Sequence, residues 1–319
     1  MNIAPTPIIM ETTSVSIIIT TFNRAEHLKL TLEAMKLLLI PDGFKVELIV
    51  VDNGSTDGTA NVIATTAPGN IGIFHLYEPE TGQTNARNAA MRLAKGDILL
   101  WTDDDVRPPK DWIAQMCAPI LTGKAMGVSG KIHAAPHLER DWMTRTHYDR
   151  LCDTRFMPED FGSMIGANMA FHRDVLERVP DFDTELGPGK LGFMDDTLFS
   201  FRMRDAEYTI ISLPDVFVEH HFDVSRLLYQ SWLKNGEASG RSIAFVDYHW
   251  EHVTLSVPYL RFLLWKCALA LFRALRRPQE LTSEGCHRYE IRMVQNISYI
   301  QQYLIERKRP RKYRRAVTC

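Results

Sequence analysis

The stretch Asp97-Ile-Leu-Leu-Trp-Thr-Asp-Asp-Asp105 joins an apolar run to three consecutive carboxylates. The run ending at Trp101 has the length and the flanking residues of a short buried strand. If the chain stays extended beyond it, Asp103 and Asp105 point to one side and Asp104 to the other. Converging carboxylates suit a hard divalent cation or a sugar hydroxyl. The stretch therefore predicts a strand that delivers a metal site, and a solvated acidic turn is the alternative.

Strand and helix patterns alternate on the N-terminal side of this stretch. Apolar runs predict strands over residues 15–19, 46–51 and 71–76, and helical spacing predicts helices over residues 24–39 and 84–94. Such alternation predicts a parallel sheet with crossover helices, whose ligands bind beyond the carboxyl ends of the strands. The first two predicted strands are followed there by side chains suited to binding: Thr21, Phe22, Asn23, Asp52 and Asn53.

Composition narrows the class of protein. A net charge of -2 at pH 7 over 319 residues gives no general case for nucleic-acid binding, although the C-terminus is strongly basic. The five cysteines are widely spaced and form no C-x-x-C, which favours a reducing cytoplasm over a disulfide framework. Residues 1–13 do not have the pattern of a signal peptide, and we expect a flexible N-terminus there. No segment is apolar enough to predict a membrane span.

Two common nucleotide motifs are missing, because no G-x-G-x-x-G follows the first predicted strand and no G-x-x-x-x-G-K-[ST] is present. The chain carries a different ordered series between residues 14 and 222. Its members are Ile17-Ile-Ile-Thr-Thr-Phe-Asn-Arg24, Val50-Val-Asp-Asn-Gly-Ser-Thr-Asp57, Ala86-Arg-Asn88, Leu100-Trp-Thr-Asp-Asp-Asp105, Gly166-Ala-Asn-Met-Ala-Phe171, Asp181-Phe-Asp183, Met194-Asp-Asp-Thr-Leu198 with Arg202, and Val218-Glu-His220. In order and spacing this series resembles the motifs of the family 2 glycosyltransferases.

The resemblance implies a fold and a division of the chain. It implies an α/β structure of the GT-A type, with a Rossmann-like mixed, mainly parallel sheet flanked by helices. The expected catalytic domain covers residues 14–224, of which residues 14–105 form the nucleotide-sugar-binding half and residues 106–224 the acceptor half. A helical, basic region is expected over residues 225–319.

The resemblance also implies roles for single residues. The residues that it assigns to the nucleotide-sugar are Thr21, Phe22, Asn23, Arg24, Asp52, Asn53, Arg87, Asp103 and Asp104. Those that it assigns to Mn²⁺ or Mg²⁺ are Asp105, Asp103 and His220. Asp195 and Asp196 correspond to the family's Glu-Asp pair, in which the aspartate is the general base. Asp196 is therefore the expected base and Asp195 the alternative; without the resemblance, the pair is better interpreted as carboxylates that stabilise a helix N-terminus.

The implied activity is inverting, metal-assisted transfer of a single sugar, by direct displacement, from a nucleoside-diphosphate sugar, with UDP as the default, to a hydroxyl acceptor. Only the basic C-terminus suggests that this acceptor is a glycan or glycolipid of an envelope polysaccharide pathway. The Q-x-x-R-W motif of processive synthases is missing. The glycines of residues 236–242 predict a loop over the active site. The alternatives are a metal-dependent nucleotidyltransferase and a catalytically silent, GT-A-like membrane adaptor.

Two basic segments in the C-terminal region indicate contact with an anionic membrane surface. Residues 255–277 predict a cationic amphipathic helix, started by Pro258 and ended by Pro278, and residues 307–315 form a dense positive run. The cations of the predicted helix are Arg261, Lys266, Arg273, Arg276 and Arg277, and its apolar residues are Leu263, Leu264, Leu271 and Phe272. We therefore expect a cytoplasmic enzyme, peripheral on the inner face of the membrane, that binds no nucleic acid. The alternatives are that the apolar stripe docks on the catalytic domain and that the tail is simply solvated.

Overall fold

The computed structural model describes residues 12–66, 69–276 and 278–314, and within these an eight-stranded sheet runs in the order β3-β2-β1-β4-β7-β6-β8-β5. Four of its seven neighbouring pairs are parallel: β1-β2, β1-β4, β2-β3 and β6-β8. The strands are β1 (Thr13–Thr21), β2 (Phe44–Asp52), β3 (Gly72–Tyr77), β4 (Ile98–Asp103), β5 (Val106–Arg107), β6 (Gly127–Ala134), β7 (Asn168–His172) and β8 (Ile210–His220). The predicted mixed α/β sheet is confirmed.

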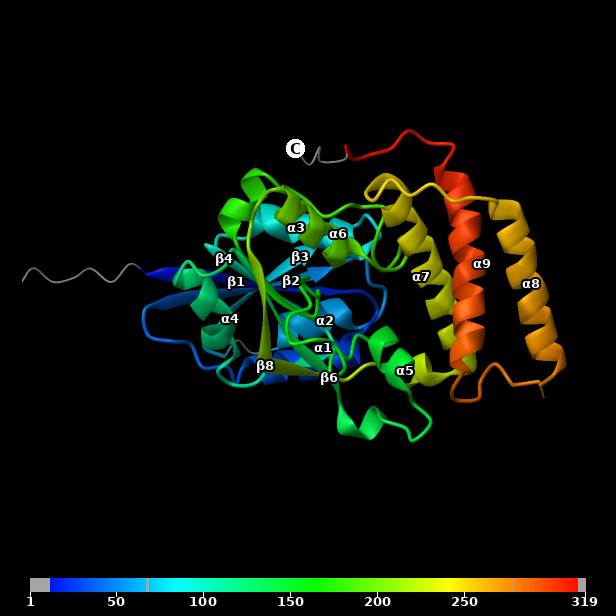
Figure 1. Cartoon of the computed structure of the whole chain (residues 1–319). Helices are drawn as coiled ribbons and strands as arrows, with labels where there is room; N and C mark the ends of the chain where they lie inside the picture. Colours follow the sequence, from blue (N-terminus) through cyan, green and yellow to red (C-terminus); the bar gives the residue numbers. More distant parts are fainter. Residues whose placement is uncertain (1–11, 67–68, 277, 315–319) are drawn as a thin grey trace, which may run out of the picture.

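Helices cover both faces of this sheet (Figure 1). In β1, Ile17 and Ile19 enter one core, and Ile18 enters the other. A strand buried on both faces in this way has a continuous apolar sequence. The first core is closed by α1 (Ala25–Met35), α2 (Thr59–Thr65) and α4 (Trp112–Leu121), and the second by α3 (Gln83–Leu93) and α6 (Asp195–Asp205).

Shorter elements complete this part of the chain. They are α5 (Arg145–Arg150) and the 3₁₀ turns η1 (Pro136–Leu138), η2 (Arg173–Glu177) and η3 (Val224–Leu227). The register of the sheet places Thr20 opposite Asp103 and Thr21 opposite Asp52. Val106 of β5 pairs with His220, the last residue of β8. The ends of β1, β2, β4 and β8 therefore bring several of the predicted site residues to one edge.

The C-terminal region is helical, as predicted. It consists of α7 (Tyr229–His249), α8 (Pro258–Ala274) and α9 (Arg288–Glu306), with α9 lying between the other two (Figure 1). Among the described residues, no helix has the length and apolarity needed to cross a membrane. Arg277, Arg315 and residues 1–11 of the expected N-terminal segment lie outside the described residues.

The prediction of a loop over residues 236–242 is wrong, because these residues lie inside α7. Their glycines allow two helix backbones to approach each other. A Cβ at Gly236 would stand 2.9 Å from the carbonyl oxygen of Ile291 in α9. A Cβ at Gly240 would stand 2.8 Å from the backbone nitrogen of Tyr299 and closer still to the carbonyl of Gln295. Small residues at a helix crossing, and not a flexible loop, explain this sequence.

Candidate active site

A cavity of about 520 Å³ opens at the strand ends described above. Its wall combines the ends of β1, β4 and β8 with the first turn of α6 and the loop before it. Most of the predicted site residues line it: Thr21, Phe22, Arg24, Asn53, Arg87, Asp103, Asp104, Asp105, Asp195, Asp196 and His220. The fold thus brings together residues from both halves of the predicted catalytic domain.

The three aspartates after β4 do not alternate along an extended chain as the sequence suggested. The strand ends at Asp103, and the chain turns through Asp104 and Asp105. Both of these carboxylates contact Arg24, at 2.6 Å from Asp104 Oδ1 and 2.8 Å from Asp105 Oδ2. Thr21 Oγ1 donates a hydrogen bond of 2.7 Å to Asp104 Oδ2. Burial raises the pKa of Asp104 to about 7, reinforced by Asp105 and opposed by Arg24 and Thr21.

Asp105 and His220 face each other at the end of β8. The Nε2 atom of His220 lies 3.3 Å from Asp105 Oδ1. Its Nδ1 atom lies 3.1 Å from the carbonyl oxygen of Leu151, which only accepts, so Nδ1 carries a proton. Burial would raise the pKa of Asp105, but His220 and Arg24 outweigh it and hold that pKa well below its usual range.

This pair fits a divalent cation. Both carboxylate oxygens of Asp105 are buried without a well-aligned hydrogen-bond donor among the described residues, although Arg24 Nη2 and His220 Nε2 lie close. Metal-bound histidines commonly donate their second ring N–H to a carbonyl, as His220 does to Leu151. Within the described residues, no group of three or more histidine, cysteine or acidic side chains forms a complete metal site. A cation here would take its remaining ligands from substrate or water.

Arg87 joins the two groups of carboxylates. Its Nη1 atom donates to Asp195 Oδ2 at 2.6 Å, and its Nη2 atom lies 3.7 Å from Asp103 Oδ1. A Cβ on Gly166 would approach within 2.9 Å of the Arg87 Cζ atom, so only glycine leaves room for this guanidinium. Burial raises the pKa of Asp195 to about 6 even though Arg87 opposes the shift.

Asp196 is held differently from its neighbour. Its Oδ2 atom accepts a 2.8 Å hydrogen bond from the backbone N–H of Gly166, and Oδ1 accepts a 2.7 Å bond from the backbone N–H of Thr197. Asp196 is only half-buried and has no ion pair with a described residue. Met194, which precedes the pair, has a left-handed backbone with φ of 71°. A non-glycine residue in this conformation is often found where a site is strained.

Two predicted residues, Asn23 and Asp52, do not line the cavity, and a third, Asn53, lines it but also holds a neighbouring loop. Asn23 Oδ1 accepts a 2.7 Å hydrogen bond from the backbone N–H of Thr56, and Asp52 Oδ1 accepts one of 2.8 Å from that of Ser55. Both side chains thus shape the loop after β2. Asn53 lines the cavity, but its side-chain amide also binds the loop before α3. Its Nδ2 donates to the carbonyls of Glu78 and Glu80, and its Oδ1 accepts from the backbone N–H of Gly82.

Several cavity residues escaped prediction, and two of them, Gln83 and Arg226, contact predicted site residues. Gln83 Nε2 donates to Thr20 Oγ1 at 3.3 Å and to Asp103 Oδ1 at 3.4 Å. Arg226 Nη1 lies 3.4 Å from His220 Nε2. Gln83 begins a helix directly after Gly82, and Arg226 follows closely after the last predicted strand end. Their positions at the ends of elements were the signal available in the sequence.

The cavity carries an excess of negative charge. The described residues of its wall include three guanidiniums, those of Arg24, Arg87 and Arg226, and one imidazole, that of His220. They also include six carboxylates: Asp103, Asp104, Asp105, Asp149, Asp195 and Asp196. A diphosphate would meet repulsion in such a cavity unless a cation entered with it.

Comparison with known proteins relates this cavity to one enzyme class. A family model described as "Glycosyl transferase family 2" matches residues 16–179, just over half of the chain. Glycosyltransferase AglE of Haloferax volcanii is 28% identical over 211 residues, which cover 65% of this chain and 66% of that protein. An undecaprenyl-phosphate 4-deoxy-4-formamido-L-arabinose transferase of Serratia proteamaculans is 32% identical over 108 residues, or 32% of each chain. The chain thus spans no more than two thirds of either relative.

A solved structure shares the fold. It is the mannosyltransferase PcManGT from Pyrobaculum calidifontis, solved in complex with GDP-Man and Mn²⁺. The two chains are 21% identical, with a TM-score of 0.59 over 91% of this chain and 86% of the other. At this identity the likeness establishes the architecture alone.

Proposed function

The chain belongs to glycosyl transferase family 2 and is a glycosyltransferase, and from this membership we propose that it moves one sugar from a nucleoside-diphosphate sugar to a hydroxyl acceptor, with inversion at the anomeric carbon. One observation carries the proposal. Two sets of carboxylates, Asp103 to Asp105 and Asp195 with Asp196, line one cavity, with Arg87 between them. The family assignment favours sugar transfer over the nucleotidyltransferase alternative.

Mn²⁺ or Mg²⁺ is the proposed cofactor. Asp105 and His220 are the proposed protein ligands, supported by the 3.3 Å approach of His220 Nε2 to Asp105 Oδ1 and by the proton on His220 Nδ1, which leaves Nε2 as the nitrogen that would bind a cation. Asp103, at the end of β4, would contact the ribose or the cation. When bound, such a cation stabilises the negative charge that develops on the departing diphosphate. The GDP-Man and Mn²⁺ held by the similar mannosyltransferase support this assignment.

The nucleotide is proposed to lie along the ends of β1 and β2. Thr21, Phe22, Arg24 and Asn53 line that part of the cavity, whereas Asn23 and Asp52 would act by shaping the loops around it. Arg24 is paired with Asp104 and Asp105. A cation bound by Asp105 would compete for these carboxylates and leave the guanidinium able to contact a phosphate. UDP is the default nucleotide, and GDP is the next candidate.

Asp196 is the proposed general base. Asp195 is buried in its ion pair with Arg87, whereas Asp196 is more accessible and is oriented by two backbone N–H groups. A carboxylate within hydrogen-bond reach of the acceptor hydroxyl takes its proton as that oxygen attacks the anomeric carbon. Attack on the face opposite the leaving diphosphate inverts the configuration. Asp195 with Arg87 would fix the start of α6.

A thermal-shift panel of UDP, GDP, dTDP and ADP, with and without Mn²⁺, tests the site. We expect one nucleotide to raise Tm only when Mn²⁺ is present, because a ligand that binds the folded state stabilises it by mass action. Asp105→Ala should lose this shift. Asp149→Ala, which removes another carboxylate from the same wall, should keep it. If no nucleotide shifts the wild type, the proposal is wrong and a silent adaptor becomes the better account.

The acceptor is proposed to be a glycan or glycolipid of an envelope polysaccharide pathway, met at a membrane surface. The undecaprenyl-phosphate transferase similarity supports a lipid-linked acceptor. The proposed enzyme is cytoplasmic and peripheral on the inner face, and its proposed domains are those expected from the sequence.

Helix α8 is the proposed membrane contact. It packs on α9 with Phe262, Trp265, Leu269 and Phe272, and does not dock on the catalytic part as the alternative required. Its other face exposes a set of large apolar side chains: Tyr259, Leu260, Leu263, Leu264, Leu271 and Leu275. The exposed cations Arg261, Lys266 and Arg276 lie on the same helix or directly after it. Apolar side chains beside cations fit an anionic bilayer.

Sedimentation with vesicles tests this contact. The wild type should co-sediment with vesicles of anionic phospholipid at low salt and much less with zwitterionic ones. Leu263→Glu/Leu264→Glu should lose binding, whereas Leu30→Glu, which changes an exposed leucine of α1, should keep it. Equal sedimentation of all three proteins would contradict the assignment to α8.

A further inference from the structure

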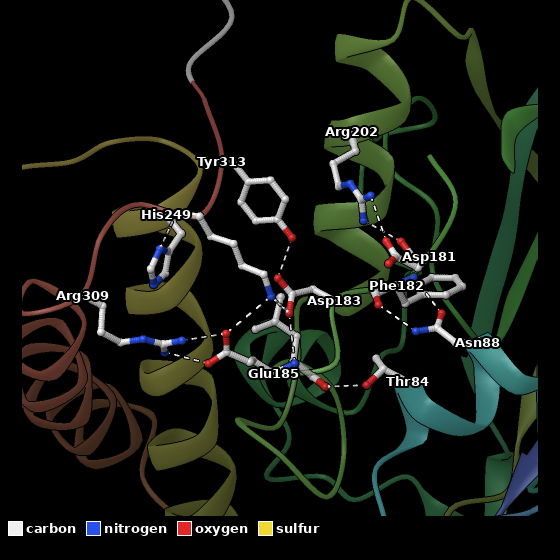
Figure 2. A network of polar contacts seen from close by, with 12 residues as sticks. Thr84, Asn88, Asp181, Phe182, Asp183, Glu185, Arg202, His249, Arg309 and Tyr313 are labelled. Carbon is white, nitrogen blue, oxygen red and sulfur yellow. Dashed lines mark hydrogen bonds and ion pairs between the residues drawn. The ribbon is translucent and has the colours of Figure 1, made fainter. Parts of the chain in front are cut away.

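The C-terminal end of the described chain returns to the catalytic part. After α9, residues 309–313, here called the strap, run back across α7 (Figure 1). They meet residues 181–194, here called the site loop (Figure 2). The site loop leads into α6, which begins with Asp195 and Asp196. The contacts join residues 124 to 130 positions apart in the sequence. The strap belongs to the basic run that the sequence suggested for lipid binding.

The strap neutralises two acidic side chains of the site loop. Lys312 Nζ donates to Asp183 Oδ1 at 2.8 Å, and Tyr313 Oη donates to Asp183 Oδ2 at 2.5 Å. The Asp183 side chain has no exposed surface, so its charge depends on these partners. Arg309 forms a two-pronged pair with Glu185, at 2.7 and 2.9 Å. Such bidentate pairs fix geometry as well as charge.

The strap is also fastened to α7, independently of the site loop. Tyr248 Oη donates to the carbonyl of Arg309 at 2.8 Å, and the backbone N–H of Lys312 donates to His249 Nδ1 at 3.0 Å. Because Nδ1 accepts this bond, the buried His249 has its ring proton on Nε2, which faces Glu306 Oε2 at 3.1 Å. These bonds give the strap a rigid base on two helices. It is a folded element and not a solvated tail.

The site loop forms part of the cavity wall. The carbonyl of Pro188 accepts a 3.0 Å bond from the backbone N–H of Gln83, and Gly189 and Gly192 line the cavity. A Cβ on Gly187 would stand 3.2 Å from Asp195 Oδ1, so the loop touches that carboxylate closely. One apolar cluster ties the loop and α6 to α7 and the strap, through Leu186, Leu191, Met194, Leu198, Phe245, Val246 and Tyr313.

We propose that the strap positions the site loop, and through it Asp195 and Asp196, so that Arg309, Lys312 and Tyr313 are positioning residues for sugar transfer. The part concerning transfer rests on the proposed function. The part concerning the loop rests on contacts alone. Loss of the strap would leave Asp183 buried without its side-chain donors, and the loop would have to open to solvate it.

Hydrogen exchange of the full chain tests the loop directly. In Lys312→Met/Tyr313→Phe, we expect amides of residues 183–194 to exchange about fivefold faster, because local opening becomes less costly. Amides of β1 and β4 should keep their wild-type rates. Lys308→Met/Tyr259→Phe is the matched control, since it removes a lysine and a tyrosine hydroxyl that make no contact with the site loop. Unchanged exchange in the strap variant would overturn the proposal.

Turnover of the donor tests the consequence for catalysis. With the nucleotide-sugar whose nucleotide most stabilises the wild type, we expect kcat of the strap variant to fall about tenfold, since small misplacements of reacting groups cost up to about 10²-fold. The nucleotide-induced shift in Tm should persist, and Lys312→Arg should retain most of the activity. Faster exchange with unchanged kcat would overturn the positioning role. A wild type without turnover would refute the proposed function, and the exchange comparison would then decide the strap's role alone.

Discussion

Replacing Arg87 by methionine removes the positive charge between the two sets of carboxylates. The side chains of Arg87 and Asp195 are 4% and 6% exposed, and their ion pair measures 2.6 Å. The guanidinium also lies over the rings of Trp101 and Phe182, at 5.9 and 5.4 Å from their centroids. Methionine keeps part of the aliphatic stem, so the main loss is electrostatic.

The expected cost follows from the burial of the partner left behind. Removing one member of a buried pair costs about 3–5 kcal/mol, because the other charge stays without compensation. Burial already raises the pKa of Asp195 to about 6 in the presence of Arg87, and removing Arg87 raises it further. When the pKa of a group is higher in the folded than in the unfolded state, protonation stabilises the folded state below the unfolded pKa. This stabilisation is lost as pH rises through the folded pKa. The deficit should therefore be about 4 kcal/mol at pH 8 and smaller at pH 5.

Urea unfolding followed by tryptophan fluorescence measures this deficit. Arg87→Met/Asp195→Asn should be more stable than Arg87→Met at pH 8, since no buried charge is left alone. Arg92→Met, on the exposed side of the same helix, should change stability by less than about 0.5 kcal/mol. An Arg87→Met protein as stable as the wild type at pH 8, or a double variant no more stable than the single one, would refute the reasoning.

Three further outcomes are expected. Gly240→Ala should destabilise the chain by about 1–3 kcal/mol in thermal unfolding, because the new Cβ meets α9 and the gain in helix propensity is only about 1 kcal/mol; Glu237→Ala, on the exposed side of α7, is the control. Cys267 is exposed on α8, whereas burial raises the pKa values of Cys117 and Cys286 to about 12, so mass spectrometry should find Cys267 alkylated before these two cysteines, and anionic vesicles should slow that reaction. Burial raises the pKa of Asp183, but the hydrogen bonds from Lys312 and Tyr313 outweigh it and lower the net value. Stability from this carboxylate is therefore present above the ordinary aspartate pKa of about 3.9 and lost as pH falls through the lowered value. On acidification below that pKa, the Tm of Lys312→Met should consequently fall by less than the Tm of the wild type, and an equal fall would contradict the assignment.

The sequence predicted the central strands well, because strands buried on both faces are continuously apolar. β1, β2 and β4 all extend the predicted runs by one to a few residues. Their ends could be assigned to one site because parallel strands end at a common edge. The short helix α2 and the two-residue strand β5 escaped prediction, since neither is long enough to show a period.

Other features depend on partners that are distant in the sequence. Asp104 and Asp105 leave the strand because Arg24, eighty positions earlier, holds both of them. Gly236 and Gly240 suggested a loop, and only the approach of α9 explains them as packing residues. Arg309 and Lys312 look like members of a solvated basic tail until Asp183 and Glu185 are placed beside them. Short-range patterns contain no information about such pairings.

The role of Asp196 is the central claim, and turnover by Asp196→Asn tests it most directly. The variant keeps the size of the side chain but cannot accept a proton from the acceptor. With the nucleotide-sugar that the wild type uses, we expect kcat to fall about 10²–10⁴-fold, while the Mn²⁺-dependent shift in Tm caused by the nucleotide stays at its wild-type size. Wild-type turnover by Asp196→Asn would contradict the account.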